Sequence, residues 1–425
     1  MDRLRILFLT PRFPFPPLRG DQVRAYHQIR VLSRRHDVTL LAVSAAPPTP
    51  EARRRMTSLC RDVIVEPLTI GRALSGLGRL GLGDPRPVQT LLYAAAGQRH
   101  VGALMAAGDF DVVHAQLVRA AAWVPSGYAV PHVIDLVDTL SASYRRRAVG
   151  APTWRRWGLS LEAARLARFE TTLLRTANRC LVVSDAEREA LGVEGHRAVV
   201  NPNGIDLDAF PFTPTRGESS RRIVFVGNLG YGPNAEGVVW FVREVLPLVR
   251  HHVAAAELAI VGPRATRTVR RLARRSGVEV VGVVPDVHVA LGRARVAVAP
   301  LHTGAGIQNK VLEAMAAGTP VVVTSRAIAG IAARAGEHCL VADDADEFAA
   351  ATATLLRDDG LRSRIATAAR ALVEDRYSWE RSVVGLEAVY RGLLAEARRD
   401  HPAHTAAVGA GGREIRRAAG DVARA

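Results

Sequence analysis

The sequence has almost no lysine. Of its 57 lysine and arginine residues, only Lys310 is a lysine. Aromatic residues make up 5% of the 425 positions, and there are three cysteines. Cys60, Cys180 and Cys339 are far apart and form no C-x-x-C pair, so neither a disulfide framework nor a zinc site is expected. We expect each cysteine to pack as a small apolar residue in a reducing compartment.

Long apolar runs are also missing. No run reaches the roughly 18 residues of a transmembrane helix, and "RILFLT" (Arg5–Thr10) is too short for the apolar region of a signal peptide. We therefore expect a cytoplasmic protein, peripheral on the inner face of the plasma membrane at most. Hydrophobic residues make up 48% of the chain, which is enough for buried cores, and the length fits two domains.

Acidic residues are fewer than basic ones. The formal net charge is +16, and residues 1–200 hold 28 arginines against 17 acidic residues. Such a surface suits nucleic acid, anionic lipid or an anionic small molecule, although a compositional bias towards Ala, Arg and Val explains it equally well. No helix-turn-helix, RNP or zinc pattern accompanies the charge, so nucleic acid is not an expected partner.

What the sequence does contain is a regular alternation of short apolar runs with helix-like stretches. In the first half the runs are residues 5–10, 37–44, 63–68, 111–116, 132–138 and 179–184. In the second half they are residues 222–228, 257–263, 278–284, 294–301, 320–325 and 339–343. Buried strands alternating with helices indicate parallel sheets covered on both faces, the doubly wound α/β pattern.

A polar stretch rich in Pro, Gly and Asn separates the two series and indicates a hinge. We expect Rossmann-like halves at residues 1–205 and 222–376 with a linker at 206–221, and the two sheets should face a central cleft. An amphipathic helix should close the fold at 377–399, followed by a disordered tail at 400–425.

The only lysine lies in "HTGAGIQNKVLEAMAAGTP" (302–320). A buried strand leads into a glycine-bearing loop, and a helix then runs to Gly318. Backbone N–H groups at such a helix start bind anions, and the helix dipole disfavours a cation there, so we interpret Lys310 as facing a phosphate. Glu313 lies one turn later, where a carboxylate can accept hydrogen bonds from vicinal hydroxyls such as those of a ribose. The alternative is a solvated Lys–Glu pair.

The stretch at 306–325 resembles the donor-site signature of GT-B glycosyltransferases of family 4, and most closely that of sugar transferases associated with exosortase and exopolysaccharide loci. Further segments resemble the same group in the same order, and the resemblance covers about residues 3–396. These segments are residues 6–41, 133–148, 168–191, 199–206, 225–247 and 377–390.

The resemblance implies a retaining glycosyltransferase. The second half would bind a nucleotide-sugar donor, linked through UDP or GDP, and the first half a saccharide or lipid-linked acceptor. Glu313 would hold the ribose hydroxyls, and Lys310 would neutralise the departing diphosphate, which removes the need for an obligatory metal or other cofactor.

The chain departs from the family pattern at two places. The common motif has two glutamates separated by seven residues, and the first position is Ala305 here. Many members carry basic residues near Asn228, where this chain has none, which leaves Arg264 as a candidate helper. The expected donor-binding residues are Gly20, Asp21, Asn228, Gly304, Ala305, Gly306, Ile307, Gln308, Lys310 and Glu313.

Three residues of the first half are candidates for the acceptor side or the chemistry. His114 falls at the end of an expected strand, where it either faces the cleft or packs in the core. Asp138 ends the next strand and either contacts the acceptor or caps a helix. Asp21 follows Gly20 and is placed as a helix N-cap, which is either a plain helix start or a loop close to the diphosphate. With Lys310, His114 and Asp138 form the expected catalytic set.

Arginines surround Trp154 and Trp157. This stretch fits an anionic membrane surface or a solvated basic helix. For the chain as a whole, two alternatives to a transferase remain: a GT-B nucleotide-sugar epimerase, and a non-catalytic GT-B protein that binds a sugar or a partner. A nicotinamide-cofactor enzyme is not expected, because no G-x-G-x-x-G follows either first strand.

Overall fold

The computed structural model describes residues 3–81, 83–106, 110–125, 130–149, 151–213, 221–303 and 307–400. The chain divides into two compact units. Unit 1 contains the residues up to Asn201 together with those from Val383 onward, and unit 2 runs from Pro202 to Ser382. Of the expected linker, residues 214–220 lie outside the described residues, as do residues 401–425 of the expected tail.

Unit 1 is built on a seven-stranded parallel sheet with the order β3-β2-β1-β4-β5-β6-β7. The strands are β1 (Arg5–Thr10), β2 (Asp37–Ser44), β3 (Asp62–Pro67), β4 (Val112–Gln116), β5 (His132–Val137), β6 (Arg179–Val182) and β7 (Ala198–Val200). The first six confirm the apolar runs of the first half. The short edge strand β7 falls where the sequence indicates only the start of the hinge.

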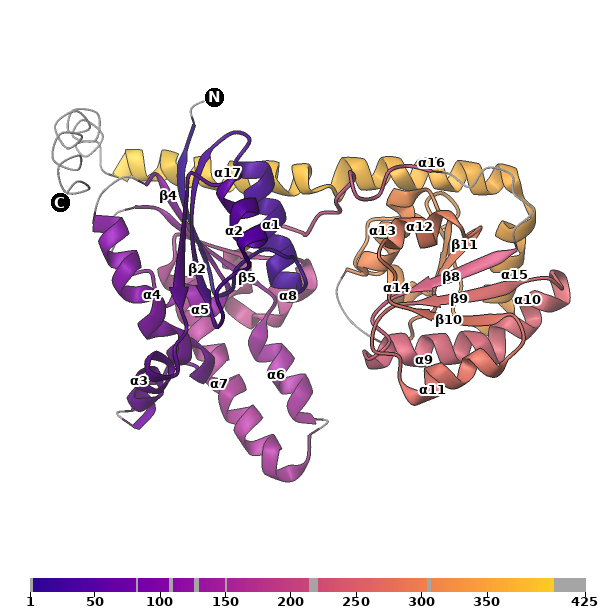
Figure 1. Ribbon diagram of the computed structural model, residues 1–425, viewed down its shortest axis with the longest axis horizontal. Helices are drawn as coiled ribbons and strands as arrows, with labels where there is room; N and C mark the ends of the chain where they lie inside the picture. Colours follow the sequence, from indigo (N-terminus) through magenta and orange to yellow (C-terminus); the bar gives the residue numbers. More distant parts are fainter. Residues whose placement is uncertain are drawn as a thin grey trace. The chain divides into compact units, whose positions relative to one another are not determined.

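Unit 2 is built on a six-stranded parallel sheet with the order β10-β9-β8-β11-β12-β13. The strands are β8 (Arg222–Val226), β9 (Glu257–Val261), β10 (Val278–Gly282), β11 (Val296–Ala299), β12 (Val321–Val323) and β13 (Leu340–Val341). All six were predicted. Continuous apolar strands let both faces of each sheet be buried, and helices cover both faces of each unit (Figure 1).

The helices of unit 1 are α1 (Gly20–Leu32), α2 (Pro50–Thr57), α3 (Ile70–Gly81), α4 (Val88–Ala106), α5 (Leu117–Ala121), α6 (Leu140–Val149), α7 (Thr153–Thr176) and α8 (Asp185–Ala190). Those of unit 2 are α9 (Gly232–Trp240), α10 (Leu246–His252), α11 (Arg267–Arg271), α12 (Val287–Gly292), α13 (Asn309–Ala317), α14 (Ser325–Ile328), α15 (Ala345–Arg357) and α16 (Asp359–Arg376). Short 3₁₀ or π segments occupy Gly192–Arg197, Phe241–Val245 and Leu272–Arg274.

The last helix, α17 (Trp379–Asp400), begins in unit 2 and continues into unit 1. Its apolar stripe is buried, including Leu386 and Leu393, which matches the amphipathic spacing of the sequence. Asp400 is the last residue of this helix and so does not belong to a disordered tail. The three cysteines are buried and free of disulfides, as expected.

Both sheets share one topological feature that places a site. The chain runs outward from the first strand to the second and third, and then returns to the other side of the first strand, so the order reverses between β1 and β4 and between β8 and β11. In sheets of this kind ligands bind outside the carboxyl ends of the strands at the reversal.

Candidate functional site

The switch point of unit 2 is lined by glycine. Gly227 directly follows β8, and Gly262 directly follows the neighbouring β9. A Cβ at Gly262, whose φ is +146°, would lie 1.8 Å from the carbonyl oxygen of Gly227. The two strand ends therefore approach backbone to backbone, which only glycine permits. Neither glycine was recognised from the sequence as a requirement of the site.

Lys310 reaches across this glycine surface from the first turn of α13. Its Cε would lie 3.2 Å from a Cβ at Gly227, and its ammonium donates a 2.9 Å hydrogen bond to Oε1 of Gln308, the helix N-cap residue. Gln308 makes no side-chain cap hydrogen bond to the helix. The structure thus brings Lys310, Gln308 and the helix start to the switch point. Gly318, at φ +83°, ends the helix as predicted.

The charges of Lys310 and Glu313 are both disfavoured by the fold. Loss of solvent lowers the pKa of Lys310 to about 8, although Glu313 acts in the opposite direction. Loss of solvent likewise raises the pKa of Glu313 to about 6, against the effect of Lys310. Folding therefore opposes both charged forms, and the pair lowers stability at neutral pH. A charged pair retained at such a cost is typical of a functional site.

Asn234, near the start of α9, carries an unsatisfied polar atom beside the lysine. Its side chain is buried, and its Nδ2 donates to the carbonyl oxygen of Asn228 at 2.9 Å. Among the described residues its Oδ1 has no hydrogen-bond partner. A Cβ at Gly227 would lie 2.9 Å from that Nδ2, so the amide borders the same glycine as Lys310. A buried acceptor of this kind normally has a partner.

Two further predicted residues lie in the loops after β8 and β9. Asn228 is exposed, and its Oδ1 accepts from the backbone N–H of Gly230 at 3.1 Å, so its side chain shapes a turn. Arg264 lies beside this turn, with its Cβ 3.0 Å from where a Cβ of Gly230 would be. Arg264 has φ +60°, an uncommon conformation for a residue other than glycine that is found preferentially at functional sites.

The loop expected to contact the donor sugar is described only in part. Gly304, Ala305 and Gly306 lie outside the described residues. Ile307 is half-buried and packs against the core of unit 2. The consequence of having Ala305 in place of the usual first glutamate therefore stays a prediction from the sequence.

At the switch point of unit 1, Gly20 and Asp21 lie at the start of α1. Gly20 is exposed, and a Cβ there would meet nothing within 4 Å. The helix N-cap is Arg19, so the expected capping role of Asp21 is wrong: the helix begins two residues too early for it. Asp21 instead forms an ion pair with Arg12, and its carbonyl oxygen accepts from Gln116 Nε2 at 2.9 Å.

The structure does not support a catalytic His114. It lies within β4, with no exposed surface, and its ring stacks on Phe8 at a centroid distance of 4.3 Å. Its Nδ1 hydrogen-bonds the hydroxyl of Tyr390 at 2.8 Å, and its Nε2 lies 3.6 Å from a carboxylate oxygen of Asp135. Burial lowers the pKa of the imidazole. A side chain enclosed in this way contacts core residues and no substrate, so the core alternative applies.

Asp138 stays accessible. It directly follows Val137, a β-branched residue with φ +65° at the end of β5, which is a strained backbone position. The Asp138 side chain is exposed. Nevertheless, loss of solvent from the surrounding protein raises its pKa, and repulsion from Glu187 adds to the shift. Asp138 therefore remains a candidate contact for an acceptor at the carboxyl edge of the unit 1 sheet (sheet 1).

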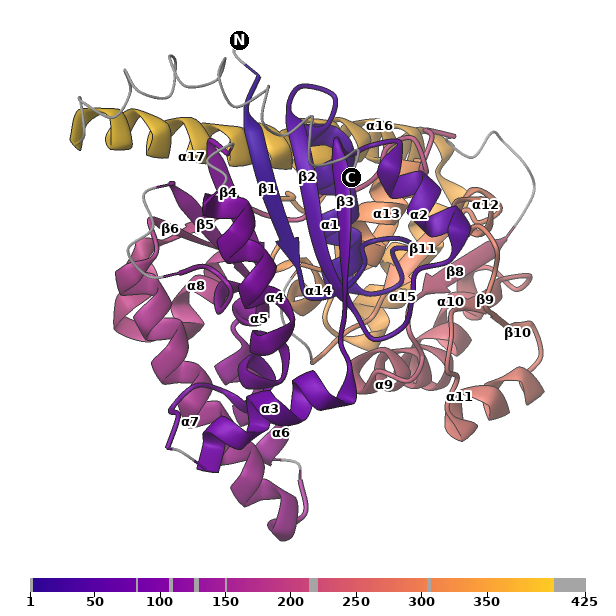
Figure 2. The same cartoon turned by 60° about the vertical axis from the view of Figure 1, so that its left-hand side comes forward.

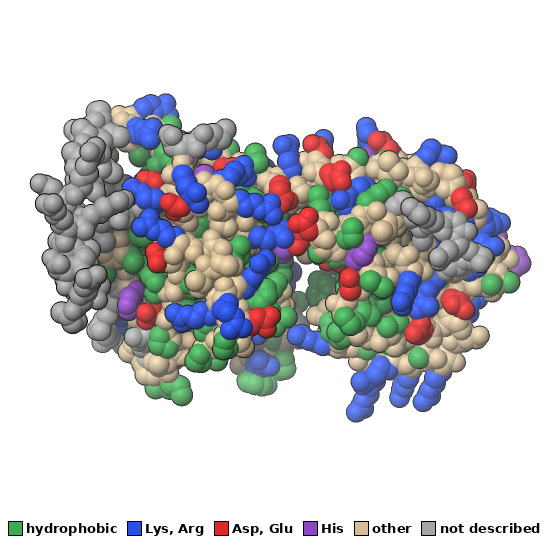
Figure 3. All heavy atoms as spheres, turned by 45° about the horizontal axis from the view of Figure 1, so that its top comes forward, with side chains coloured by type: hydrophobic (Ala, Val, Ile, Leu, Met, Phe, Trp, Pro, Cys, Tyr) green, Lys and Arg blue, Asp and Glu red, His purple; other side chains and the backbone are tan. Residues whose placement is uncertain are grey.

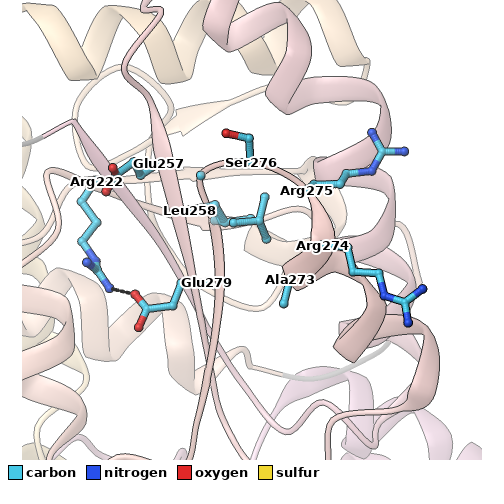
Figure 4. A pocket seen from close by; sticks show the side chains of 10 residues that line it. Arg222, Glu257, Leu258, Ala273, Arg274, Arg275, Ser276 and Glu279 are labelled. Atoms are coloured by element: carbon cyan, nitrogen blue, oxygen red, sulfur yellow. Dashed lines mark hydrogen bonds and ion pairs between the residues drawn. The ribbon is translucent and has the colours of Figure 1, made fainter.

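A hollow in unit 2 lies at the opposite, amino edge of the sheet. It is lined by the first residues of β8, β9 and β10. Arg222 and Glu279 form an ion pair across it at 2.5 Å, while Arg274 and Arg275 point away (Figure 4). Because this is the wrong edge of a doubly wound sheet for a ligand, and Arg222 and Glu279 already pair across the hollow, we do not assign a ligand to it.

Within the part of the chain that the structure describes, no group of three or more His, Cys, Asp or Glu side chains is placed to hold a metal ion. No helix within that part has both the length and the apolar character needed to cross a membrane. On the face drawn in Figure 3, the basic side chains are interspersed with acidic ones.

Solved structures define the class of this fold. Anabaena HepE, crystallised in complex with UDP and glucose, matches with a TM-score of 0.58 and 16% identity over 92% of this chain and 100% of HepE. At that identity the likeness shows the fold alone. The two Rossmann-like units thus form the GT-B fold of glycosyltransferases, as the sequence predicted.

Two family profiles identify the family. "Glycosyltransferase Family 4" matches residues 19–209, and "Glycosyl transferases group 1" matches residues 220–358. A phosphatidyl-myo-inositol mannosyltransferase from Mycobacterium leprae is 32% identical over 47% of this chain and 55% of its own length. The protein of that name from Mycobacterium tuberculosis is 28% identical over 69% of this chain and 76% of its own length. The chain belongs to the family 4 glycosyltransferases.

Proposed function

We propose that this chain is a retaining glycosyltransferase that transfers a hexose from a nucleoside diphosphate sugar to a hydroxyl of a saccharide or lipid-linked acceptor. Unit 2 would bind the donor and unit 1 the acceptor. The observation that carries the proposal is the Lys310–Glu313 pair at the glycine-lined switch point of unit 2. Family membership supports the activity, and the relatives' names support hexoses and lipid-linked acceptors.

The contacts of the site suggest how it would work. The glycine surface at Gly227 and Gly262 leaves room for a diphosphate against the backbone. Lys310, now held by Gln308, would turn to the phosphates, and the start of α13 would add backbone N–H donors. As the bond to the sugar breaks, charge develops on the diphosphate, and a fixed cation there stabilises the transition state. Glu313 would hold the ribose hydroxyls.

Binding of nucleotides tests the donor half. UDP and GDP should be titrated calorimetrically into wild type, Lys310→Ala and Glu313→Ala. UDP is the first choice because the HepE structures contain it. We expect each variant to bind about tenfold to a hundredfold more weakly, the loss typical of a charge-assisted contact. Arg334→Ala and Glu337→Ala are the matched controls, because this exposed pair has the same i,i+3 spacing. Equal binding by Lys310→Ala and wild type would mean that the site is assigned wrongly.

Turnover tests the reaction. A panel of nucleotide sugars should be offered with saccharide and with lipid-linked acceptors, with nucleotide release and product mass as readouts. Loss of the Lys310 charge should slow turnover by about a hundredfold or more. The linkage formed should keep the anomeric configuration of the donor. Formation of an epimerised nucleotide sugar, with no transfer to any acceptor, would favour an epimerase, and nucleotide binding with no reaction of any donor would favour a non-catalytic protein.

Two further expectations belong to this proposal. Because a lysine and helix N–H groups would neutralise the diphosphate, turnover should be unchanged by EDTA, and a tenfold loss that Mg²⁺ restores would contradict this. A role in exopolysaccharide or cell-surface synthesis follows from the resemblance of the motifs. It predicts that deletion of the gene removes a surface saccharide, which complementation by the wild type restores and by Lys310→Ala does not.

A further inference from the structure

A helical hairpin projects from unit 1. Helices α6 and α7 lie side by side, and α6 begins at Leu140, just beyond the carboxyl end of β5. Figures 1 and 2 both show the hairpin extending away from the strand ends. Its tip is formed by the end of α6 and the first two turns of α7, and residues 152–158 are all exposed.

The hairpin tip carries large apolar side chains that are mostly exposed to solvent. Trp154 is 79% exposed, Trp157 is 75% exposed and Val149 is 78% exposed. The other three tryptophans of the chain are buried or half-buried. Trp154, Trp157 and Leu161 are spaced i, i+3 and i+7, so they share one face of α7 over about 10 Å. A group of exposed tryptophans on one face marks an interaction site.

The charge of the hairpin is predominantly positive, and the two acidic residues of α6 and α7, Glu162 and Glu170, are buried. Residues 140–169 contain a single acidic residue, Glu162, which is buried and accepts a hydrogen bond from the backbone N–H of Val88 at 3.0 Å. The same stretch contains seven arginines, and those at the tip itself are exposed. They are Arg145, Arg146, Arg147, Arg155, Arg156, Arg165 and Arg168.

We propose that the hairpin tip docks this protein on an anionic membrane surface. Tryptophan prefers the boundary between headgroups and acyl chains, and arginines beside it pair with lipid phosphates. A second copy of the chain is a poorer occupant, because a symmetric contact would bring two sets of seven arginines together with one buried acid on each side. Charge complementarity thus selects the lipid.

The position of the tip fits an enzyme that draws its acceptor from a membrane. Helix α3 also begins just beyond a strand end, that of β3, and it exposes Ile70 and Leu74. Both figures show α3 and the hairpin on the same side of sheet 1, the carboxyl side where Asp138 lies. Docking by the tip therefore places the proposed acceptor edge towards the bilayer. This second step rests on the proposed function, whereas docking itself does not.

The experiment uses the full chain with vesicles of phosphatidylglycerol and of phosphatidylcholine. Co-sedimentation gives the partition constant, and tryptophan emission reports burial of the indoles. We expect binding to phosphatidylglycerol that weakens with added salt, weak binding to phosphatidylcholine, and a blue shift on binding. Trp154→Ala/Trp157→Ala should lower the partition constant about tenfold or more. Arg155→Ala/Arg156→Ala should lower it about 10- to 30-fold.

Arg270→Ala/Arg271→Ala is the matched control, because it removes the same charge from exposed positions of α11 in unit 2. Equal losses in this control and in the hairpin variants would overturn the proposal, as would wild type that ignores phosphatidylglycerol at low salt. Light scattering gives the oligomeric state. A dimeric wild type together with a monomeric tryptophan variant would overturn the proposal in favour of self-association. Nucleotide binding and thermal melting should be unchanged in the hairpin variants, so a failure of docking and a failure of the proposed transferase activity are read separately.

Discussion

The two units share the order of their first six strands and differ at the place where that order reverses. In unit 2 the switch point is formed by the backbone of Gly227 and Gly262, and Lys310 lies beside it. In unit 1 the corresponding region beneath α1 is filled by an ion network: Arg24 and Asp135 pair at 2.6 Å with no exposed side-chain surface, and His114 and Tyr390 extend the network. Topology therefore decides where a ligand site lies, and local side chains decide whether the site is open.

The network of unit 1 is held together by opposing effects on one carboxyl group. Burial alone raises the pKa of Asp135, but Arg24 and His114 outweigh it and bring that pKa to about 2. Asp135 also accepts from the backbone N–H of Val137 at 3.1 Å. The strained residue at the end of β5 is thus fixed by the same carboxylate that balances Arg24. We read this network as a rigid support and the unit 2 edge as the binding surface.

The largest effect on stability should come from removing the carboxylate that pairs with Arg24 in unit 1. Asp135→Asn leaves Arg24 buried without a counter-charge, and we expect the free energy of unfolding to fall by about 3–5 kcal/mol, measured by urea denaturation. Glu279→Gln is the control in unit 2. Its partner Arg222 is partly exposed, and the change should stay within about 1 kcal/mol. Similar losses in both variants would remove the distinction between a buried and an exposed ion pair.

The next effect tests the glycine edge of unit 2. Gly262→Ala forces a Cβ to 1.8 Å from the Gly227 oxygen at a φ that disfavours alanine, so we expect a loss of about 2–4 kcal/mol in unfolding free energy and weaker UDP binding. Gly20→Ala at the unit 1 switch point meets nothing within 4 Å and should stay within about 0.5 kcal/mol. Calorimetric melting and UDP titration check both. An unaffected Gly262→Ala variant would show that the two strand ends are free to separate.

A smaller effect is the pH dependence of nucleotide binding. Lys310 carries its charge below its pKa of about 8, and Glu313 carries its charge above about 6, so UDP affinity should be highest between these values. Outside the window it should fall by up to about tenfold per pH unit. Lys310→Arg should remove the alkaline limb because guanidinium stays charged, and Glu313→Gln should remove the acid limb. Limbs unchanged by these substitutions would show that other groups titrate.

The smallest effect concerns Tyr390. Tyr390→Phe removes one buried hydrogen bond to His114, and the free energy of unfolding should drop by about 1 kcal/mol, with turnover unchanged. Tyr231→Phe, at an exposed residue of unit 2, should leave stability at the wild-type value. A large loss of turnover with normal stability would instead return His114 to the chemistry and contradict its role in the core.

The sequence predicts the strands well because their signal is local. Twelve apolar runs mark twelve strands, and only β7 escapes, since its three residues run directly into Asn-Pro. Its helix prediction around Lys310 also holds, because Gly318 ends that helix through a local left-handed turn. These features depend on neighbours a few residues away.

The sequence predicts less well what depends on distant partners. His114 is correctly placed on a strand, but the residue that encloses it, Tyr390, comes from 276 positions later. The close approach of Gly227 and Gly262 depends on the pairing of β8 with β9, which no local pattern reports. The sequence identifies Asn234 only as a polar residue of a loop. Its unsatisfied Oδ1 depends on the packing of α9, which places Asn234 beside Lys310.

The path of α17 has a consequence for biosynthesis. Unit 2 is one continuous stretch, whereas unit 1 takes its last core residues, among them Leu386 and Tyr390, from beyond Val383. During synthesis unit 2 can therefore complete its fold before unit 1. Unit 1 stays incomplete until α17 has been made and can pack against it. A released chain that ends near residue 382 would present a complete unit 2 and an incomplete unit 1 with exposed apolar surface, the form that chaperones and proteases bind.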